Sequence, residues 1–144
     1  MQLFLDASVL LAAAGSTQGA SRAIFTYAAA QKWSLISSPY ALNEVLRNLG
    51  KLPTPATADW LRLRLQLAVV DDVVALDRPV VFAASKDRPI LFTALAWTQV
   101  LLTLDKADFA DLLGRKFYGL DVLLPYEFLE RERAAGRLSP SKTP

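Results

Sequence analysis

The feature that most constrains this chain is a short apolar run at its start that stops at a carboxylate. Residues 1–5 read Met-Gln-Leu-Phe-Leu, and Asp6 follows directly. A short apolar run with a polar end is typical of a buried strand in a parallel sheet, where helices cover both faces. In open α/β sheets, ligands bind just outside the carboxyl ends of the strands. We therefore expect Asp6 to lie at the mouth of such a crevice.

Similar apolar runs recur along the chain, separated by stretches with helical periodicity. Further strands are expected at residues 33–37, 67–70, 99–104 and 121–124. Helices are expected at 8–14, 21–31 (with Ser21 as N-cap), 39–49, 61–66, 73–85, 90–97, 107–113 and 125–137. The alternation of arginines and leucines at 61–66 also leaves a strand open there. Alternating strands and helices predict an α/β/α sandwich with a central, mainly parallel sheet of four to five strands.

The composition is that of one globular domain. With 144 residues, 53% of them hydrophobic, the chain is long enough to bury a core. Without an internal repeat or linker, we expect a single domain over residues 1–138 and a disordered tail at 139–144. No apolar run is as long as a membrane span, and the first residues lack the basic start of a secretory signal. We expect a soluble cytoplasmic protein.

Two missing residue types narrow the chemistry. The chain has no histidine and no cysteine. This excludes a Ser-His-Asp triad, a Cys-His nucleophile and the usual zinc ligand sets. An enzyme made from this chain would rely on carboxylates, a hydroxyl, a lysine or a hard metal ion. The net charge of +2 is compatible with a polyanionic partner, and equally with an ordinary soluble protein.

Four carboxylates stand out by their place relative to the expected elements. Asp6 and Asp105 each follow an apolar strand, and Asp87 precedes the helix that leads into the Asp105 strand. Glu44 lies inside a helix. Taken singly, a strand-end aspartate is more often a turn or cap residue, and a mid-helix glutamate is more often solvated. Only the set of four points to a site.

The segments around these acids resemble the PIN domain, the metal-dependent ribonuclease fold that includes the VapC-type toxins of toxin–antitoxin pairs. The resemblance extends from Met1 to about Arg133. It rests on FLDASVL at 4–10, SPYALNEV at 38–45, KDRPILFTALA at 86–96 and LLTLDKADF at 101–109. The chain departs from the family pattern at Ala7, Ser8, Arg88 and Leu104, where threonine, asparagine, a small residue and glycine are more usual.

The resemblance implies an active site with named residues. Asp6, Glu44, Asp87 and Asp105 match the family's four acidic positions and would bind Mg²⁺ or Mn²⁺. Asp6 and Asp105 would be the primary ligands, directly or through water, and either Glu44 or Asp87 would serve as general base. Three further residues would support these ligands: Ser8, Thr103 and Asp108, the last matching an additional acid that some members use. Oxygen-only ligands favour such hard ions over zinc. A bound ion could activate water and stabilise charge on a phosphodiester.

The substrate and partners follow from the same resemblance. RNA would be held by basic side chains near the acids, which contact phosphates without reading bases: Arg22, Arg47, Lys86, Arg88 and Lys106. A small antitoxin protein and a homodimer are further expectations.

Three other functions are compatible with a chain of this general type. An aspartate-dependent phosphatase needs an aspartate where Ser8 stands, and a nucleotide-binding module needs a glycine-rich loop that residues 7–15 lack. The third alternative, a catalytically inactive PIN-like module that binds RNA or protein, stays open, because Arg88 could pair with Asp87 and compete with the metal.

Overall fold

A six-stranded sheet forms the centre of the computed structural model, which describes residues 1–76, 82 and 85–140. The strand order is β3-β2-β1-β4-β6-β5. Five strands run parallel to their neighbours, and the edge strand β5 runs antiparallel to β6. The strands are β1 (Gln2–Leu5), β2 (Ser34–Ser37), β3 (Leu67–Val69), β4 (Val100–Leu102), β5 (Arg115–Phe117) and β6 (Leu120–Leu123).

The central strand β1 shows why the apolar run at the start forms the middle of the sheet. Leu3, Phe4 and Leu5 have no exposed surface. In register, Leu3 lies between Leu35 of β2 and Val100 of β4. Apart from the exposed Gln2 at its start, the strand has neighbours on both edges and helices on both faces, so its buried positions suit apolar side chains. The first polar position after Leu3, Phe4 and Leu5 is therefore Asp6, just past the end of β1.

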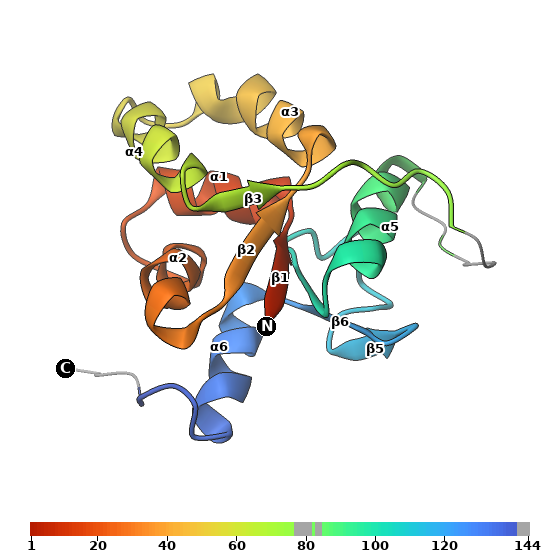
Figure 1. Ribbon diagram of the computed structural model, residues 1–144. Coiled ribbons are helices and arrows are strands. Elements are labelled where there is room, and N and C mark those ends of the chain that lie inside the picture. The colour runs from red at the N-terminus through yellow and green to blue at the C-terminus, as the bar shows by residue number, and fades with distance from the viewer. Residues whose placement is uncertain (77–81, 83–84, 141–144) are drawn as a thin grey trace.

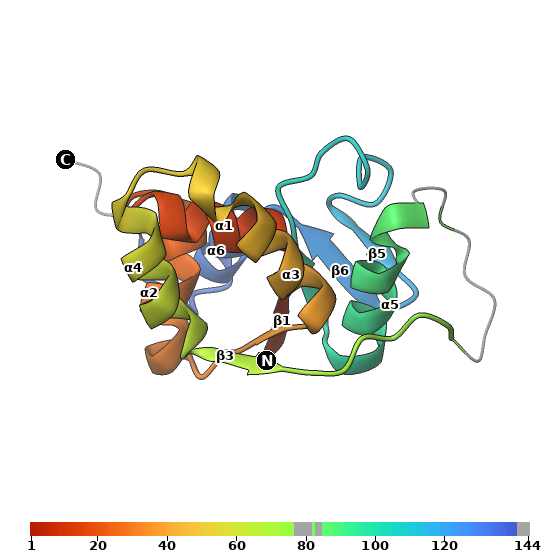
Figure 2. The same ribbon diagram turned by 90° about the horizontal axis from the view of Figure 1, so that it is seen from above.

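Helices cover both faces of the sheet. In Figure 1, α1 and α2 lie to the left of β1 and β2, and α5 lies to their right. Seen from above, α3 lies over the carboxyl ends of the strands, between α1 and α5 (Figure 2). The helices are α1 (Ala7–Gly15), α2 (Ala20–Gln31), α3 (Pro39–Asn48), α4 (Pro55–Arg64), α5 (Arg88–Trp97) and α6 (Pro125–Ala134), with short 3₁₀ turns η1 (Leu49–Lys51) and η2 (Ser85–Asp87).

Proline starts four of these helices. A proline occupies the first turn of α3, α4, α5 and α6. Its fixed φ suits the helix, and its missing N–H would have had no helical partner there. The start of α3 is also capped from outside, because the Asp72 carboxylate accepts a hydrogen bond from the Tyr40 N–H. None of the described helices is long and apolar enough to cross a membrane.

The predicted α/β/α sandwich is confirmed, with local differences. The sheet has six strands, because β5, which was not predicted, forms a hairpin with β6, the strand expected at 121–124. Its turn residues Tyr118 and Gly119 both have positive φ, at 50° and 86°. Such turns match the twist of paired strands. The preceding segment was expected to be a helix at 107–113; it forms a series of turns over 106–114 instead, in which Leu112 and Leu113 N–H both donate to the Phe109 carbonyl.

Several helix boundaries also differ. The helix predicted at 61–66 starts at Pro55, and the alternative of a strand there is wrong. Gly19, and not Ser21, is the N-cap of α2. Of the helix expected within 73–85, residues 73–76 have no regular structure, 85 belongs to η2, and most of the remainder lies outside the described residues, as does 141–144 of the expected tail.

Candidate metal centre

Asp6 is fixed at the junction of β1 and α1. It is the N-cap of α1, with extended backbone angles (φ −66°, ψ 156°), and its side chain is 4% exposed. One carboxylate oxygen, Oδ1, accepts the Ala7 N–H at 2.8 Å. The other, Oδ2, accepts the Thr103 hydroxyl at 2.7 Å and the Ser8 hydroxyl at 3.1 Å. These contacts hold the carboxylate in one orientation.

The segment after β4 is tied to the same point. Thr103 Oγ1 accepts the Asp105 N–H at 3.1 Å, and Ser8 Oγ accepts the Leu104 N–H at 3.0 Å. Because β1 and β4 are parallel neighbours with Leu5 opposite Leu102, the residues that follow both strands meet at one edge. The two hydroxyls therefore join the Asp6 carboxylate to the backbone that positions Asp105.

Three carboxylates gather beside this junction. One oxygen from each of Asp87, Asp105 and Asp108 lies within 4.8 Å of the others. Asp87 comes from η2 at the start of α5, whereas the Asp108 N–H donates to Asp105 Oδ1 at 3.0 Å. Asp87 is 7% exposed, and its buried Oδ2 has no hydrogen-bond partner among the described residues. A buried carboxylate oxygen without a partner, next to two more carboxylates, suits a hard divalent cation.

The electrostatics of the three acids reflect this crowding. Burial, a hydrogen bond with Asp108, and the charges of Asp108, Asp6 and Asp105 raise the Asp87 pKa to about 8. The same hydrogen bond, with help from Lys86, lowers the pKa of Asp108. A pKa raised this far favours the protonated form of Asp87 at neutral pH when no cation is bound.

Asp6 and Glu44 lie outside the tight group, but the charge of Asp6 acts on Asp87 and the charge of Glu44 acts on Asp6. Burial raises the Asp6 pKa against the effect of its hydrogen bonds, and the charge of Glu44 raises it further. Glu44 is half-buried on α3, and no ion pair between it and Arg47 occurs in the described part of the chain. Of the four predicted ligands, the structure thus brings Asp87 and Asp105 together and leaves Asp6 and Glu44 outside the group, whereas Asp108, expected as a supporting residue, lies in it.

Tyr40 is a site residue that sequence reasoning missed. Its hydroxyl donates to the Lys86 carbonyl, which links α3 to the segment that carries Asp87. Burial raises the pKa of Tyr40, as do the charges of Glu44 and Asp87. The available signal was its position four residues before Glu44, which places both side chains on one helix face.

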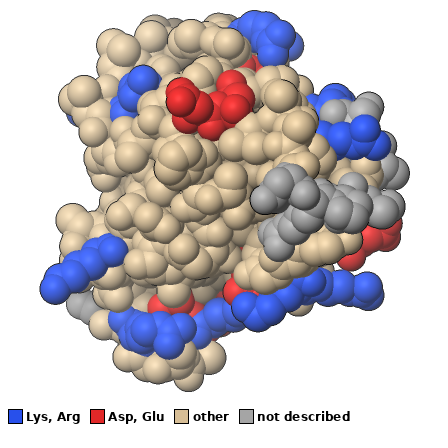
Figure 3. Space-filling model, turned by 45° about the vertical axis from the view of Figure 1, so that its right-hand side comes forward, with Lys and Arg blue, Asp and Glu red and all other residues tan. Residues whose placement is uncertain are grey.

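The basic residues predicted to bind RNA differ in whether they already contact other groups of the protein. Lys86 Nζ lies 3.1 Å from Asp108 Oδ2, so one cation already contacts the acids. Arg88 donates from Nε to the Phe82 carbonyl at 3.0 Å, and within the described ranges it forms no ion pair with Asp87. Arg47 and Lys106 are exposed and unpaired in those ranges. On the face in Figure 3, basic side chains stand on either side of a compact acidic patch.

Arg22 does not fit the predicted RNA-binding role. Its guanidinium pairs with Asp59 at 2.8 Å and donates to the Ala13 carbonyl at 2.7 Å. The side chain is only 18% exposed. These contacts tie α2 to α1 and α4, so Arg22 serves the packing of the helices.

Comparison with known proteins supports the fold alone. No family model and no curated protein matches the chain. A chain in the crystal structure of VapBC2 from Rickettsia felis, bound to a DNA fragment from the promoter, superposes with a TM-score of 0.60. The match covers 85% of this chain and 97% of that one, at 13% identity. The likeness shows that the two chains share a fold.

Proposed function

We propose that this protein is a Mg²⁺- or Mn²⁺-dependent endoribonuclease and the toxin of a toxin–antitoxin pair. The observation that carries the proposal is the group of Asp87, Asp105 and Asp108, whose oxygens lie within 4.8 Å beside the buried Asp6. It lies at the carboxyl edge of a parallel sheet, where such folds bind ligands. The PIN-like fold shared with a VapBC2 chain supports the same assignment.

The residues suit a hard cation. Asp87, Asp105 and Asp108 would hold it, with Asp6 and Glu44 on the adjoining side. When bound, the cation would act as a Lewis acid that lowers the pKa of a water molecule and stabilises negative charge on the phosphodiester. Thr103 and Ser8 keep the Asp6 carboxylate in a single rotamer through their hydroxyls. Partners of this kind around metal ligands are worth 10- to 100-fold in affinity.

The substrate would be held by its phosphates. Arg47 and Lys106 are exposed cations without ion pairs among the described residues, and Arg88 is exposed at the start of α5. Without a cation, Lys86 forms an ion pair with Asp108. If a cation binds the Asp108 carboxylate instead, the Lys86 ammonium can contact an RNA phosphate. Such contacts give affinity without base specificity.

The proposed partner is a small antitoxin. VapBC2 is a complex of this general type, and its structure includes promoter DNA. On this chain, Leu46 on α3, Leu61 on α4 and Leu65 at its end are 62%, 64% and 85% exposed. Three exposed leucines on two consecutive helices form apolar surface that could be buried against an antitoxin or against a second copy of the chain.

Calorimetric titration with Mn²⁺ tests the proposal first. Wild-type protein should bind saturably, Asp87→Asn and Asp105→Asn should lose binding, and Asp6→Asn should weaken it strongly. Asp111→Asn is a matched control, because Asp111 is exposed in the same 106–114 segment but lies outside the group. RNA cleavage that requires Mn²⁺ and fails in Asp6→Asn would then support the nuclease. Metal-independent cleavage, or equal cleavage by Asp6→Asn, would refute it.

One observation favours the alternative of a non-catalytic RNA- or protein-binding module. Lys86 already neutralises Asp108 in the group, so the acids have a partner of their own. Under this alternative, Mn²⁺ does not bind even when Lys86→Gln removes the competing ammonium. Tighter Mn²⁺ binding by Lys86→Gln than by wild type would favour the nuclease.

A further inference from the structure

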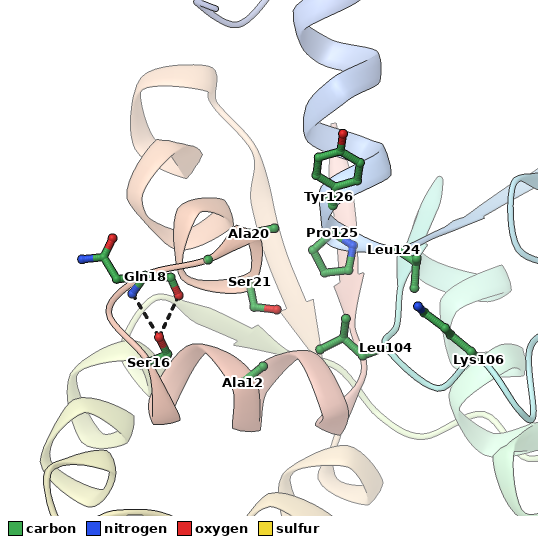
Figure 4. A pocket seen from close by; sticks show the side chains of 11 residues that line it. Ala12, Ser16, Gln18, Ala20, Ser21, Leu104, Lys106, Leu124, Pro125 and Tyr126 are labelled. Atoms are coloured by element: carbon green, nitrogen blue, oxygen red, sulfur yellow. Dashed lines mark hydrogen bonds between the residues drawn. The ribbon is translucent and has the colours of Figure 1, made fainter. Parts of the chain in front are cut away.

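A pocket of 430 Å³ has Leu104 and Lys106, on either side of Asp105 in the chain, in its wall. The end of α1, the start of α2, the 104–106 segment and the start of α6 enclose it (Figure 4). Its volume is within the range of small-molecule sites, which starts at about 300 Å³. Its wall is continuous with the metal centre, since the Leu104 N–H donates to Ser8 Oγ and Lys106 directly follows Asp105.

The start of α2 offers backbone donors to this pocket. Gly19, the N-cap, and the next two residues of this 12-residue helix line the pocket. No side chain caps the helix, and the first intrahelical bond is made by the Ala23 N–H to the Gly19 carbonyl. The preceding N–H groups therefore have no helical partner, and they carry the positive end of the helix dipole. Helix starts of this kind favour phosphate groups.

A hydroxyl without a hydrogen-bond partner in the described residues points into the same space. Ser21 is 7% exposed, yet its hydroxyl forms no hydrogen bond within the described part of the chain. Figure 4 shows the hydroxyl directed into the pocket, and the Lys106 ammonium directed in from the opposite wall. Lys106 has no ion pair in the described ranges. Because the Ser21 hydroxyl opens to the pocket, a ligand bound there can accept a hydrogen bond from it.

The remaining wall is apolar and aromatic. Leu104, Leu124, Pro125 and Tyr126 form it, and Tyr126 is 63% exposed. An aromatic ring beside an anion site matches a nucleotide, because bases stack on aromatic faces regardless of sequence. A free phosphate would use the donors but not this wall.

We infer that this pocket is a nucleotide subsite that holds one phosphate and one base of an RNA strand running across the metal centre. The inference rests on the proposed ribonuclease function for its substrate. Ser21, Lys106 and the start of α2 bind the phosphate, and Tyr126 stacks on the base. An RNA strand that is cleaved at the carboxylates is thereby also bound in this pocket. Strands long enough to reach both places therefore bind with higher affinity than dinucleotides.

Fluorescence anisotropy with a labelled short single-stranded RNA in EDTA tests the subsite without cleavage. Lys106→Gln should weaken binding several-fold at low salt and reduce the slope of log affinity against log salt by about 0.7, the value of one phosphate contact. Tyr126→Ala should weaken binding about tenfold and leave the slope unchanged, as stacking does. Ser21→Ala should weaken it less than either. Lys51→Gln, at an exposed lysine that pairs with Asn48, is the matched control.

The outcomes separate the subsite from the nuclease. All pocket variants should retain wild-type Mn²⁺ binding, since none touches a carboxylate of the cluster. Variants that bind RNA as tightly as Lys51→Gln, or wild-type protein that does not bind RNA in EDTA, would overturn the subsite whatever the metal result. If the wild type does not bind Mn²⁺ but the variants show the expected order of RNA affinities, the nuclease is refuted and the subsite stands.

Discussion

Thr103 Oγ1 lies 2.7 Å from Asp6 Oδ2, although the two residues are 97 positions apart in the chain. Each follows the end of a central strand, and the parallel pairing of β1 with β4 brings them together. Thr103 has no exposed surface. Its hydroxyl also accepts the Asp105 N–H. One buried hydroxyl therefore fixes two of the proposed site's carboxylate-bearing residues relative to each other.

Replacing Thr103 by valine removes this link while keeping the side-chain volume. Because Asp6 Oδ2 and the Asp105 N–H then lose a partner in a buried setting, the free energy of unfolding should fall by about 1–3 kcal/mol. Mn²⁺ affinity should fall about 10- to 100-fold. Urea unfolding and calorimetry measure the two effects. Thr103→Ser retains the hydroxyl and should keep most of the metal affinity; equal losses in both variants would contradict this explanation.

The stability of the metal-free protein should decrease as pH rises from about 4 to about 8. Asp87 has a folded-state pKa of about 8 against an ordinary value of 3.8. Between these values the folded protein holds a proton that the unfolded chain has released, so unfolding becomes easier with rising pH. The raised pKa of Asp6 acts in the same direction. The lowered pKa of Asp108 acts only below its ordinary value of 3.8 and does not cancel the effect.

Urea midpoints in EDTA at several pH values measure this dependence. Asp87→Asn removes the titrating group, so its midpoint should change less with pH than that of the wild type and should be higher at pH 8. A parallel pH dependence in the two proteins would show that Asp87 is not the group responsible.

The site could be predicted where strand geometry alone decides position. Asp6 and Asp105 follow buried parallel strands, and such strands deliver whatever follows them to one edge. Asp108 was harder, because its place depends on a turn in which its own N–H bonds to Asp105 Oδ1. No periodicity encodes that turn, and the expected helix at 107–113 would have turned Asp108 elsewhere. The role of Tyr40 depends on a contact with η2, which is equally invisible in the sequence.

The fold was predictable for a similar reason, with one exception. Apolar runs identify strands that are buried on both faces, and these include β1 and β4. The strand β5 reads Arg-Lys-Phe and lies at the edge, where two exposed basic residues give no apolar signal. Its pairing with β6 depends on the positive φ of Tyr118 and Gly119. Tyrosine rarely adopts this conformation, so the turn had no sequence signature.

Arg22→Gln should destabilise the protein without weakening RNA binding. The substitution removes the 2.7 Å hydrogen bond to the Ala13 carbonyl, and a bond of this charged type contributes about 1.5–3 kcal/mol. It also leaves Asp59 without its closest cation. Arg47→Gln, at an exposed unpaired arginine, is the converse control: it should leave the urea midpoint unchanged and weaken RNA binding. Weaker RNA binding by stable Arg22→Gln protein would restore Arg22 to the proposed RNA surface.

Mn²⁺ should stabilise the protein more at pH 8 than at pH 6. The cation must displace the proton on Asp87, and at pH 6 Asp87 is mostly protonated because its pKa is about 8. A concentration of cation 100 times its dissociation constant contributes about 2.7 kcal/mol to the free energy of unfolding. Apparent affinity should therefore rise with pH, and the Mn²⁺-induced shift in thermal midpoint with it. Asp111→Asn should follow the wild type, whereas Asp105→Asn should show no shift at either pH. A shift that is independent of pH would mean that the cation binds away from Asp87.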